Sequence, residues 1–113
     1  SGKYQDGALP EGARFSAYLQ HGVRQTLMAG RFVNEKSLES TRRFMDIAKD
    51  AGMAPVTLAT AWSKQHDFVA STIVGVSKFD QLADILAAAD LELSADVMKA
   101  CDAVTKDQMY PMG

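Results

Sequence analysis

The sequence predicts an α/β fold that is mostly helical and contains about one strand. Four segments place apolar side chains at the spacing of one helix face, whereas residues 69–76 form a short β-branched apolar run typical of a buried strand. The 113 residues are 47% apolar and 23% charged, which is the ordinary composition of a globular domain. We therefore expect residues 1–113 to form a single unit.

The N-terminal third has the weakest pattern. Residues 1–13 hold three of the eight glycines and a proline in a short polar stretch, which predicts a loop. Residues 14–33 place apolar side chains at roughly helical spacing, but Gly22 and Gly30 interrupt them. We expect a helix there.

Two helices with clear end signals follow. Residues 37–51 carry apolar side chains on one face, and Gly52 stands where a left-handed cap would end the helix. Residues 55–65 begin with Pro55, which a first helical turn tolerates, and continue with good helix formers.

A strand, a tight turn and a helix are expected to follow one another after residue 68. The strand covers 69–76, and Ser77 stands three residues before Asp80, as in a capping box, ahead of a helix that continues to about residue 89. Ser94 resembles another N-cap, before a last helix and the tail 107–113.

The predicted strand has no partner in this chain. A lone buried strand leaves both rows of backbone donors and acceptors unpaired, at a cost of about 1–3 kcal/mol for each group. Three arrangements would resolve this: the strand belongs to a sheet whose other members lie upstream, two copies pair it between chains, or the segment is not a strand here.

The segment 73–78 is the most informative local feature. It joins a strand end to a helix N-terminus through Gly75, so that free N–H groups, the helix dipole and the Lys78 ammonium would meet where a phosphate could bind. The alternative is that Ser77 only caps the helix and that Lys78 is solvated.

Six short motifs lie along the chain. They are Ser1-Gly-Lys-Tyr4, Pro10-Glu-Gly-Ala-Arg-Phe15, Leu58-Ala-Thr-Ala-Trp62, Val69-Ala-Ser-Thr-Ile-Val-Gly-Val-Ser77 with Gln81-Leu82, Leu91-Glu-Leu-Ser94 and Tyr110-Pro111. In order and spacing they resemble successive signatures of the aldo-keto reductases, most of all the Tas-like bacterial branch of these NADP-dependent oxidoreductases.

The resemblance implies a (β/α)8 TIM barrel of which this chain is the C-terminal part. It would begin in the loop after the seventh strand and contain the eighth strand, 69–76, whereas a whole barrel needs about 250 residues. The family transfers hydride between NADP(H) and a carbonyl or alcohol substrate, and its four catalytic residues lie upstream. We therefore assign no catalytic residue and expect no turnover by this chain alone.

The resemblance also implies contacts to the cofactor. Lys3 and Arg14 match loop positions that reach its phosphates. Gly75, Ser77 and Gln81 match the positions that hold the adenosine 2′-phosphate and the adenine. Lys78 is added because its charge suits the 2′-phosphate. The predicted cofactor-binding residues are Lys3, Arg14, Gly75, Ser77, Lys78, Gln81 and Asp84, and no metal ligand is predicted.

Composition and charge limit the other partners. The formal charge of −2 without a basic stripe argues against nucleic acid, and the longest mostly apolar run, 68–76, is about half of what a spanning helix needs. The single cysteine, Cys101, cannot form an internal disulfide and lies on an apolar helix face, which favours the cytoplasm. Helix faces shaped to cover a barrel would be exposed in this chain, so we expect self-association.

Three functional hypotheses remain at this point. The chain is part of an NADP-dependent carbonyl reductase, or it is a catalytically inactive helical remnant that binds a nucleotide or associates with itself, or it has a purely structural role. Protection from unfolding by NADP⁺ would separate a nucleotide-binding remnant from a structural one, because a ligand that binds only the folded state raises its stability.

Overall fold

The computed structural model describes residues 1–112, which form six α-helices, one short 3₁₀ helix and no strand. The helices are α1 (Arg14–Gln20), α2 (Gly22–Phe32), α3 (Glu35–Asp50), α4 (Pro55–Lys64), α5 (Gln81–Leu86) and α6 (Ala95–Asp107), and the 3₁₀ helix η1 spans Gln5–Gly7. Gly113, the last residue of the expected tail, lies outside the described residues. Within residues 1–112 no helix is long and apolar enough to cross a membrane.

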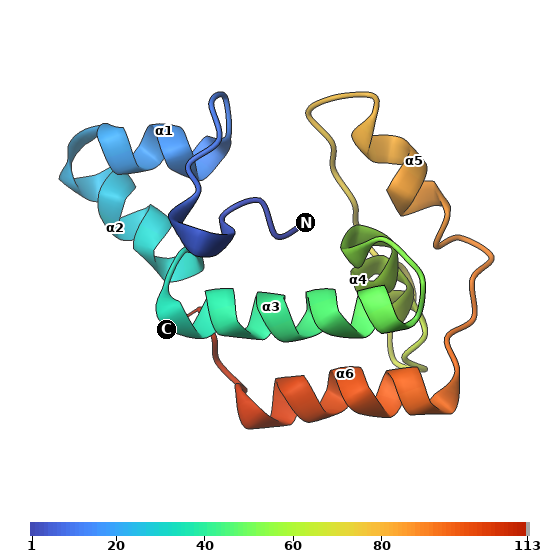
Figure 1. Cartoon of the computed structure of the whole chain (residues 1–113). Coiled ribbons are helices and arrows are strands. Elements are labelled where there is room, and N and C mark those ends of the chain that lie inside the picture. Colours follow the sequence, from blue (N-terminus) through green and yellow to red (C-terminus); the bar gives the residue numbers. More distant parts are fainter. Residues whose placement is uncertain (113) are drawn as a thin grey trace.

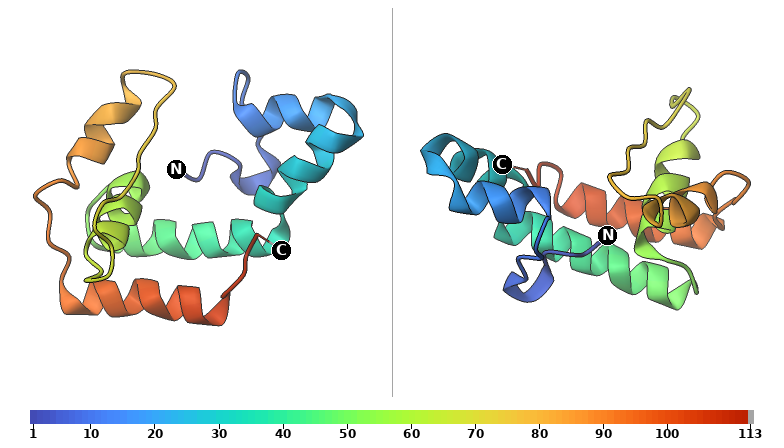
Figure 2. Two further views of the ribbon diagram at one scale, coloured as in Figure 1. Left: turned by 180° about the vertical axis from the view of Figure 1, so that it is seen from behind. Right: turned by 90° about the horizontal axis from the view of Figure 1, so that it is seen from above.

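The helices divide into a packed base and two projecting parts. Helices α3 and α6 lie side by side, and α4 crosses one end of them (Figures 1 and 2). The α1–α2 hairpin stands above the other end of α3, and α5 with the long loop before it stands above α4 (Figure 1). The two projecting parts therefore stand at opposite ends of the base (Figure 1).

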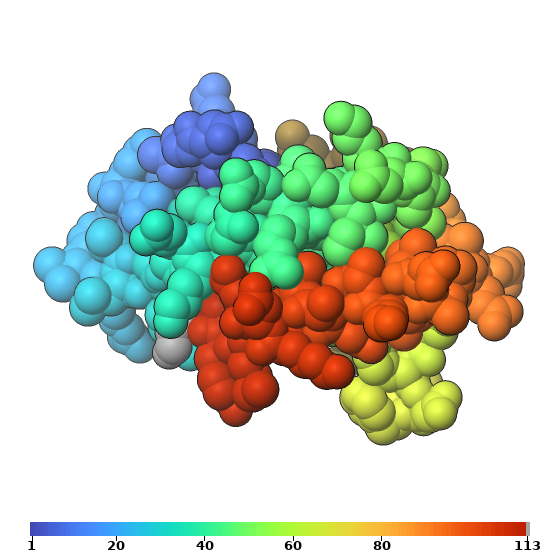
Figure 3. Space-filling view, turned by 60° about the horizontal axis from the view of Figure 1, so that its bottom comes forward, coloured from blue at the N-terminus to red at the C-terminus, as the bar shows by residue number. Residues whose placement is uncertain are grey.

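The hydrophobic core lies where α3, α4 and α6 meet. The buried residues of this cluster are Ala48, Leu58, Ala61, Ala88, Leu93 and Cys101. Leu58 and Cys101 are the largest side chains with no exposed surface, and Phe44 packs edge-to-face on Trp62 at 5.6 Å between ring centroids. Figure 3 shows α6 and α3 in contact along much of their length.

Side-chain caps fix the ends of the core helices. The predicted helix 37–51 begins two residues earlier, at Glu35, because Asn34 and Ser37 form a capping box: each side chain accepts a hydrogen bond from the backbone N–H of the other residue, at 3.0 and 3.2 Å. The Ser94 hydroxyl accepts a hydrogen bond from Val97 N–H at 3.3 Å, so the predicted N-cap of the last helix is confirmed.

The single helix predicted over 14–33 is wrong in one respect, because the structure has two helices there. They are separated at His21, and Gly22 begins α2 with φ +65°. Residues with a Cβ rarely adopt this left-handed conformation. The glycine therefore marks a turn between two helices that pack as a hairpin.

The predicted strand over 69–76 does not form in this chain. The segment is irregular, and residues 70–76 make no backbone–backbone hydrogen bond to any described residue. Ile73 is 97% exposed, and Val74 and Val76 are also exposed. The physical reason is the one that made a lone strand doubtful: without a neighbouring strand, its donors and acceptors pair better with water.

The predicted helix after Ser77 is shorter than expected and is capped differently. It ends at Leu86 rather than near residue 89, and Asp80 makes no side-chain cap. Instead, Gln81 Oε1 accepts hydrogen bonds from Ser77 N–H at 3.1 Å and from the Ser77 hydroxyl at 3.4 Å. The predicted Ser77–Asp80 capping box is therefore wrong, since the first residue of the helix supplies the acceptor.

Two polar contacts from α4 hold α5 and the loop behind it. The Thr57 hydroxyl donates to the Asp84 carbonyl at 2.6 Å. The Gln65 side chain pairs with the backbone of Leu93 in both directions, its Nε2 donating to the carbonyl at 2.9 Å and its Oε1 accepting from the N–H at 2.7 Å. Helix α4 thus connects the core to the segment that carries Gln81.

Candidate functional site

A cavity of about 510 Å³ lies between the two projecting parts. Its lining residues are Lys3, Tyr4, Gly12, Ala13, Arg14, Phe15, Gly75, Val76, Ser77 and Gln81. One wall comes from the N-terminal loop and the start of α1, and the other from the segment before α5 and the first residue of α5. Five of the seven predicted cofactor-binding residues therefore line one cavity, although they come from opposite parts of the chain.

The N-terminal wall carries two cations, Lys3 and Arg14, and each is followed in the sequence by an aromatic residue. The backbone N–H of Phe15 donates to the Tyr4 hydroxyl at 3.0 Å, and the two rings lie 5.7 Å apart. The Lys3 ammonium lies 5.5 Å from the centroid of the Tyr4 ring. Lys3 directly precedes Tyr4, and Arg14 directly precedes Phe15. The hydrogen bond between Tyr4 and Phe15 therefore joins the two segments that carry the cations.

The opposite wall is polar and uncharged. Ser77 and Gln81 are exposed and joined by the hydrogen bonds that start α5. A Cβ added at Gly75 would meet nothing within 4 Å, so no protein atom of the described chain requires a glycine there. The open space at Gly75 is on the wall of the cavity, where a ligand could approach the backbone.

Three backbone N–H groups near the start of α5 are already bonded. Ser77 N–H is bonded to Gln81, Gln81 N–H to the Lys78 carbonyl at 3.2 Å, and Leu82 N–H to the Phe79 carbonyl at 3.0 Å. The helix has only six residues, so its dipole is small. These three N–H groups are therefore not free to bind an anion.

Lys78 and Asp84 are not among the residues that line the cavity. Both side chains are exposed. Lys78 lies in the turn before α5, where its carbonyl is bonded, and the Asp84 carbonyl accepts from Thr57 on the side that faces α4. Their predicted roles toward a cofactor thus remain predictions.

Tyr4 is the lining residue with a structural role that sequence reasoning missed. It directly follows Lys3 in the first motif, so the sequence already shows an aromatic residue next to a cation. Its bond to Phe15 joins residues eleven positions apart. Only the fold of the loop could reveal that contact.

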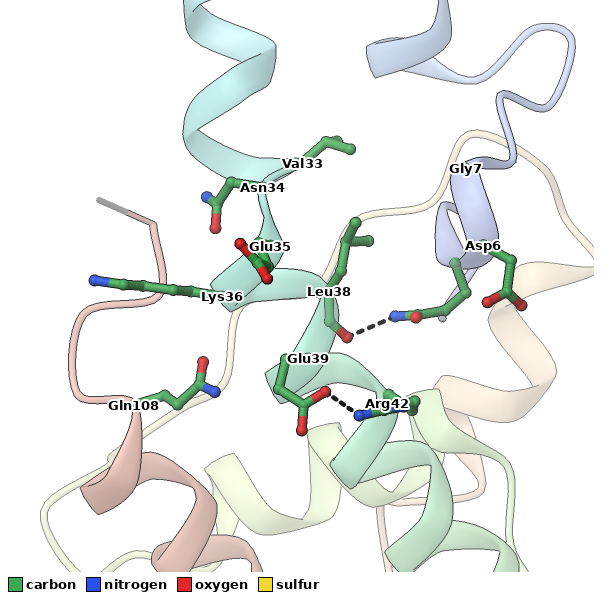
Figure 4. A pocket seen from close by; sticks show the side chains of 11 residues that line it. Asp6, Gly7, Val33, Asn34, Glu35, Lys36, Leu38, Glu39, Arg42 and Gln108 are labelled. Atoms are coloured by element: carbon green, nitrogen blue, oxygen red, sulfur yellow. Dashed lines mark hydrogen bonds and ion pairs between the residues drawn. The ribbon is translucent and has the colours of Figure 1, made fainter.

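A larger hollow of about 810 Å³ lies on another side of the molecule, beside η1, the start of α3 and the end of α6 (Figure 4). It contains none of the predicted site residues. Its charges are mixed: Asp6, Glu35 and Lys36 line it, and Glu39 is already paired with Arg42 (Figure 4). Since no charge dominates, this hollow is a weaker candidate than the cationic cavity.

Neither Cys101 nor His66 lines the cationic cavity. Burial, followed by the negative charge of Asp102, raises the pKa of the Cys101 thiol to about 11, so the cysteine is a neutral core residue. His66 Nδ1 lies 2.7 Å from the Trp62 carbonyl, and Nε2 lies 3.6 Å from Asp102 Oδ1. This histidine therefore joins α4 to α6.

No metal centre is formed by residues 1–112, in which no group of three or more His, Cys, Asp or Glu side chains is placed to hold an ion. The residues that line the cationic cavity include none of these four types. The arrangement is suited to binding an anionic molecule through Lys3 and Arg14.

The chain belongs to the aldo/keto reductase family, because the profile of that family matches residues 3–106. This confirms the family that the motifs indicated. Members of the family fold as TIM barrels, and this chain supplies only helices and irregular segments over residues 1–112.

Individual relatives agree with this assignment. The protein tas of Escherichia coli K12 is 33% identical over 111 residues, which cover 98% of this chain and 30% of the relative. A putative voltage-gated potassium channel subunit beta of Schizosaccharomyces pombe is 31% identical over 109 residues, which cover 92% of this chain and 30% of the relative. The chain thus spans about a third of the length of the curated relatives that it matches.

Proposed function

We propose that this chain contributes part of the cofactor-phosphate site of an oxidoreductase that transfers hydride between NADP(H) and a carbonyl or alcohol substrate. The observation that carries the proposal is the convergence of five residues, predicted from the sequence alone, on one cavity: Lys3, Arg14, Gly75, Ser77 and Gln81. Membership of the aldo/keto reductase family supports the choice of a nicotinamide cofactor.

The charges and size of the cavity fit the phosphate part of such a cofactor. A volume of about 510 Å³ lies within the usual range of small-molecule sites, about 300–1,000 Å³. Lys3 and Arg14 would hold the diphosphate, since a guanidinium matches phosphate oxygens with two donors and an ammonium adds a point charge. Ser77 and Gln81 would hold the 2′-phosphate and the adenine from the other wall.

The remaining predicted contacts would form at the edge of this site. Lys78 would act on the 2′-phosphate and so favour NADP over NAD, and Asp84 would contact the adenosine. The bound cofactor would supply the hydride, and the role of these side chains is to bind and orient it. In the whole protein the substrate would be a carbonyl compound, and we expect the protein to act in the cytoplasm.

Self-association is a second proposed property, and exposed apolar side chains favour it. Phe68, Ile73 and Phe79 are 84–97% exposed in a single loop before α5. Apolar groups of this size in one region usually contact a partner. Sedimentation of the chain at increasing concentration tests this, and a monomer at every concentration would contradict it.

Titration calorimetry with NADP⁺, and with NAD⁺ in parallel, tests the cofactor proposal. We expect the wild-type chain to bind NADP⁺ more tightly, and we expect Lys3→Gln and Arg14→Gln each to weaken binding about tenfold, because each removes a charge-assisted contact. The matched control is Arg24→Gln, an exposed residue of α2 outside the cavity. Lys78→Gln should reduce affinity for NADP⁺ and leave NAD⁺ unchanged.

The proposal is wrong for this chain if millimolar NADP⁺ gives no binding heat and no rise in melting temperature. It is also wrong if Arg24→Gln weakens binding as much as Lys3→Gln does. In that case the interaction depends on net charge and not on the cavity.

A further inference from the structure

Tyr4 joins the two segments that carry the cations of the cavity. Its side chain belongs to the N-terminal loop, directly after Lys3, and contacts the first turn of α1, directly after Arg14. Both Tyr4 and Phe15 line the cavity together with the two charged residues. Tyr4 therefore directly follows one cation in the sequence and contacts the residue that directly follows the other.

The tyrosine hydroxyl takes the place of a missing helix cap. The N-cap position of α1 is Ala13, whose side chain has no acceptor, so the first amides of the helix need a partner from elsewhere. Tyr4 supplies it to Phe15 N–H at 3.0 Å. This hydrogen bond fixes the first turn of α1 relative to the loop. Arg14 is the first residue of that helix, so its position relative to the loop is fixed as well.

The tyrosine ring acts on the other cation. Its centroid lies 5.5 Å from the Lys3 ammonium, within the range in which the negative face of an aromatic ring attracts a cation. Two like charges on one wall repel each other, and the ring offsets part of that repulsion for Lys3. Contact with the Phe15 ring at 5.7 Å keeps the tyrosine ring in place.

We propose that Tyr4 is a positioning residue, which holds Lys3 and Arg14 at a fixed separation so that both can bind the phosphate groups of one dinucleotide. This inference rests on the proposed function and adds a residue to it. Tyr4 acts through the two cations, because its hydroxyl is engaged by the backbone of α1 and its ring by Phe15.

Two substitutions separate the parts of this role. Tyr4→Phe keeps the ring and removes the hydroxyl, and we expect it to weaken NADP⁺ binding about three- to tenfold in calorimetry, the effect of one lost hydrogen bond. Tyr4→Leu removes both contacts and should weaken binding further. Tyr110→Phe, at an exposed tyrosine of the C-terminal tail, is the matched control and should bind like the wild type.

Two further measurements distinguish positioning from a general loss of structure. In a Lys3→Gln/Arg14→Gln background, Tyr4→Phe should cause no additional loss of affinity, since there are no cations left to position. In the free chain, Tyr4→Phe should raise the hydrogen-exchange rate of the Phe15 amide while amides of α3 and α6 keep their rates.

The outcomes are separable. If the wild-type chain does not bind NADP⁺, the proposed function fails and this inference fails with it. If the wild type binds and Lys3→Gln and Arg14→Gln weaken binding, but Tyr4→Phe binds like the wild type, only the positioning role is overturned. The role is also overturned if Tyr4→Phe weakens binding equally when both cations are absent.

Discussion

The base formed by α3, α4 and α6 and the parts that form the cavity are stabilised in different ways. In the base, Leu58, Ala61 and Cys101 have no exposed surface, and partly buried apolar side chains, including the Phe44–Trp62 pair, pack against them. In the α1–α2 hairpin, Val23 is 78% exposed and Leu27 is 69% exposed. In the long loop before α5, Ile73 is 97% exposed. Apolar burial is concentrated in the base.

The difference indicates how the candidate site keeps its shape. Its two walls carry polar and aromatic contacts, such as Tyr4 with Phe15 and Ser77 with Gln81, whereas the main core cluster lies in the base. Regions with few buried apolar contacts open at a lower free energy than the core does. We therefore expect substitutions in the base to affect stability and substitutions in the walls to affect binding.

The largest expected effect is a cavity in the base. Leu58→Ala should lower the free energy of unfolding by about 2–5 kcal/mol, because it removes a fully buried side chain from close packing. Leu27→Ala, the same change on the exposed face of α2, should stay within about 0.5 kcal/mol. Urea unfolding of both variants measures the contrast, and equal losses would show that α2 is buried in solution.

The next effect concerns thiol reactivity. Because the pKa of Cys101 is raised to about 11, its thiolate is roughly a hundredfold scarcer at neutral pH than that of a thiol titrating at 9.0, and burial adds to its protection. A thiol reagent should label Cys101 only on unfolding. In Ser71→Cys, the added thiol lies in the exposed loop and should react at once.

The same shift has a pH consequence whose sign follows from burial. The folded state disfavours the thiolate, so stability should be highest below about pH 9 and should fall as the pH rises toward 11. Cys101→Ser should remove most of this slope. A slope that persists in the variant would assign it to other groups.

A smaller loss should follow from removing the contact between α4 and the loop behind α5. Gln65→Ala leaves the N–H and carbonyl of Leu93 without their partners and should cost about 1–3 kcal/mol. Gln20→Ala, at an exposed glutamine of α1, is the control and should change little. Thermal unfolding of the two variants makes the comparison, and indistinguishable midpoints would mean that water replaces the Leu93 contact.

The smallest effect is expected for the ion pair between α3 and the end of α6. Arg43 Nη1 lies 2.6 Å from Asp107 Oδ2, and the two side chains are 33% and 68% exposed. Arg43→Gln should therefore cost no more than about 1 kcal/mol, and less in high salt. A salt-independent loss larger than this would show that the arginine packs as well as pairs.

Local patterns predicted the base better than the walls. The predicted helices 37–51 and 55–65 agree with α3 and α4 to within two residues at each end, because their caps and apolar faces are set by nearby residues. The helix over 14–33 was predicted without its break, although Gly22 gave the signal. The strand over 69–76 failed because a strand depends on a neighbour, which no local pattern can supply.

The sequence by itself determined the family, the core helices and the five lining residues that match family motifs, since these depend on residue identity and short spacing. Only the tertiary structure decided that Lys3 and Arg14 share a wall through Tyr4, that Gln81 and not Asp80 caps α5, and that Lys78 lies off the cavity. These features join residues through loop geometry and side-chain hydrogen bonds. Their formation depends on how the chain folds back on itself, which periodicity and composition do not specify.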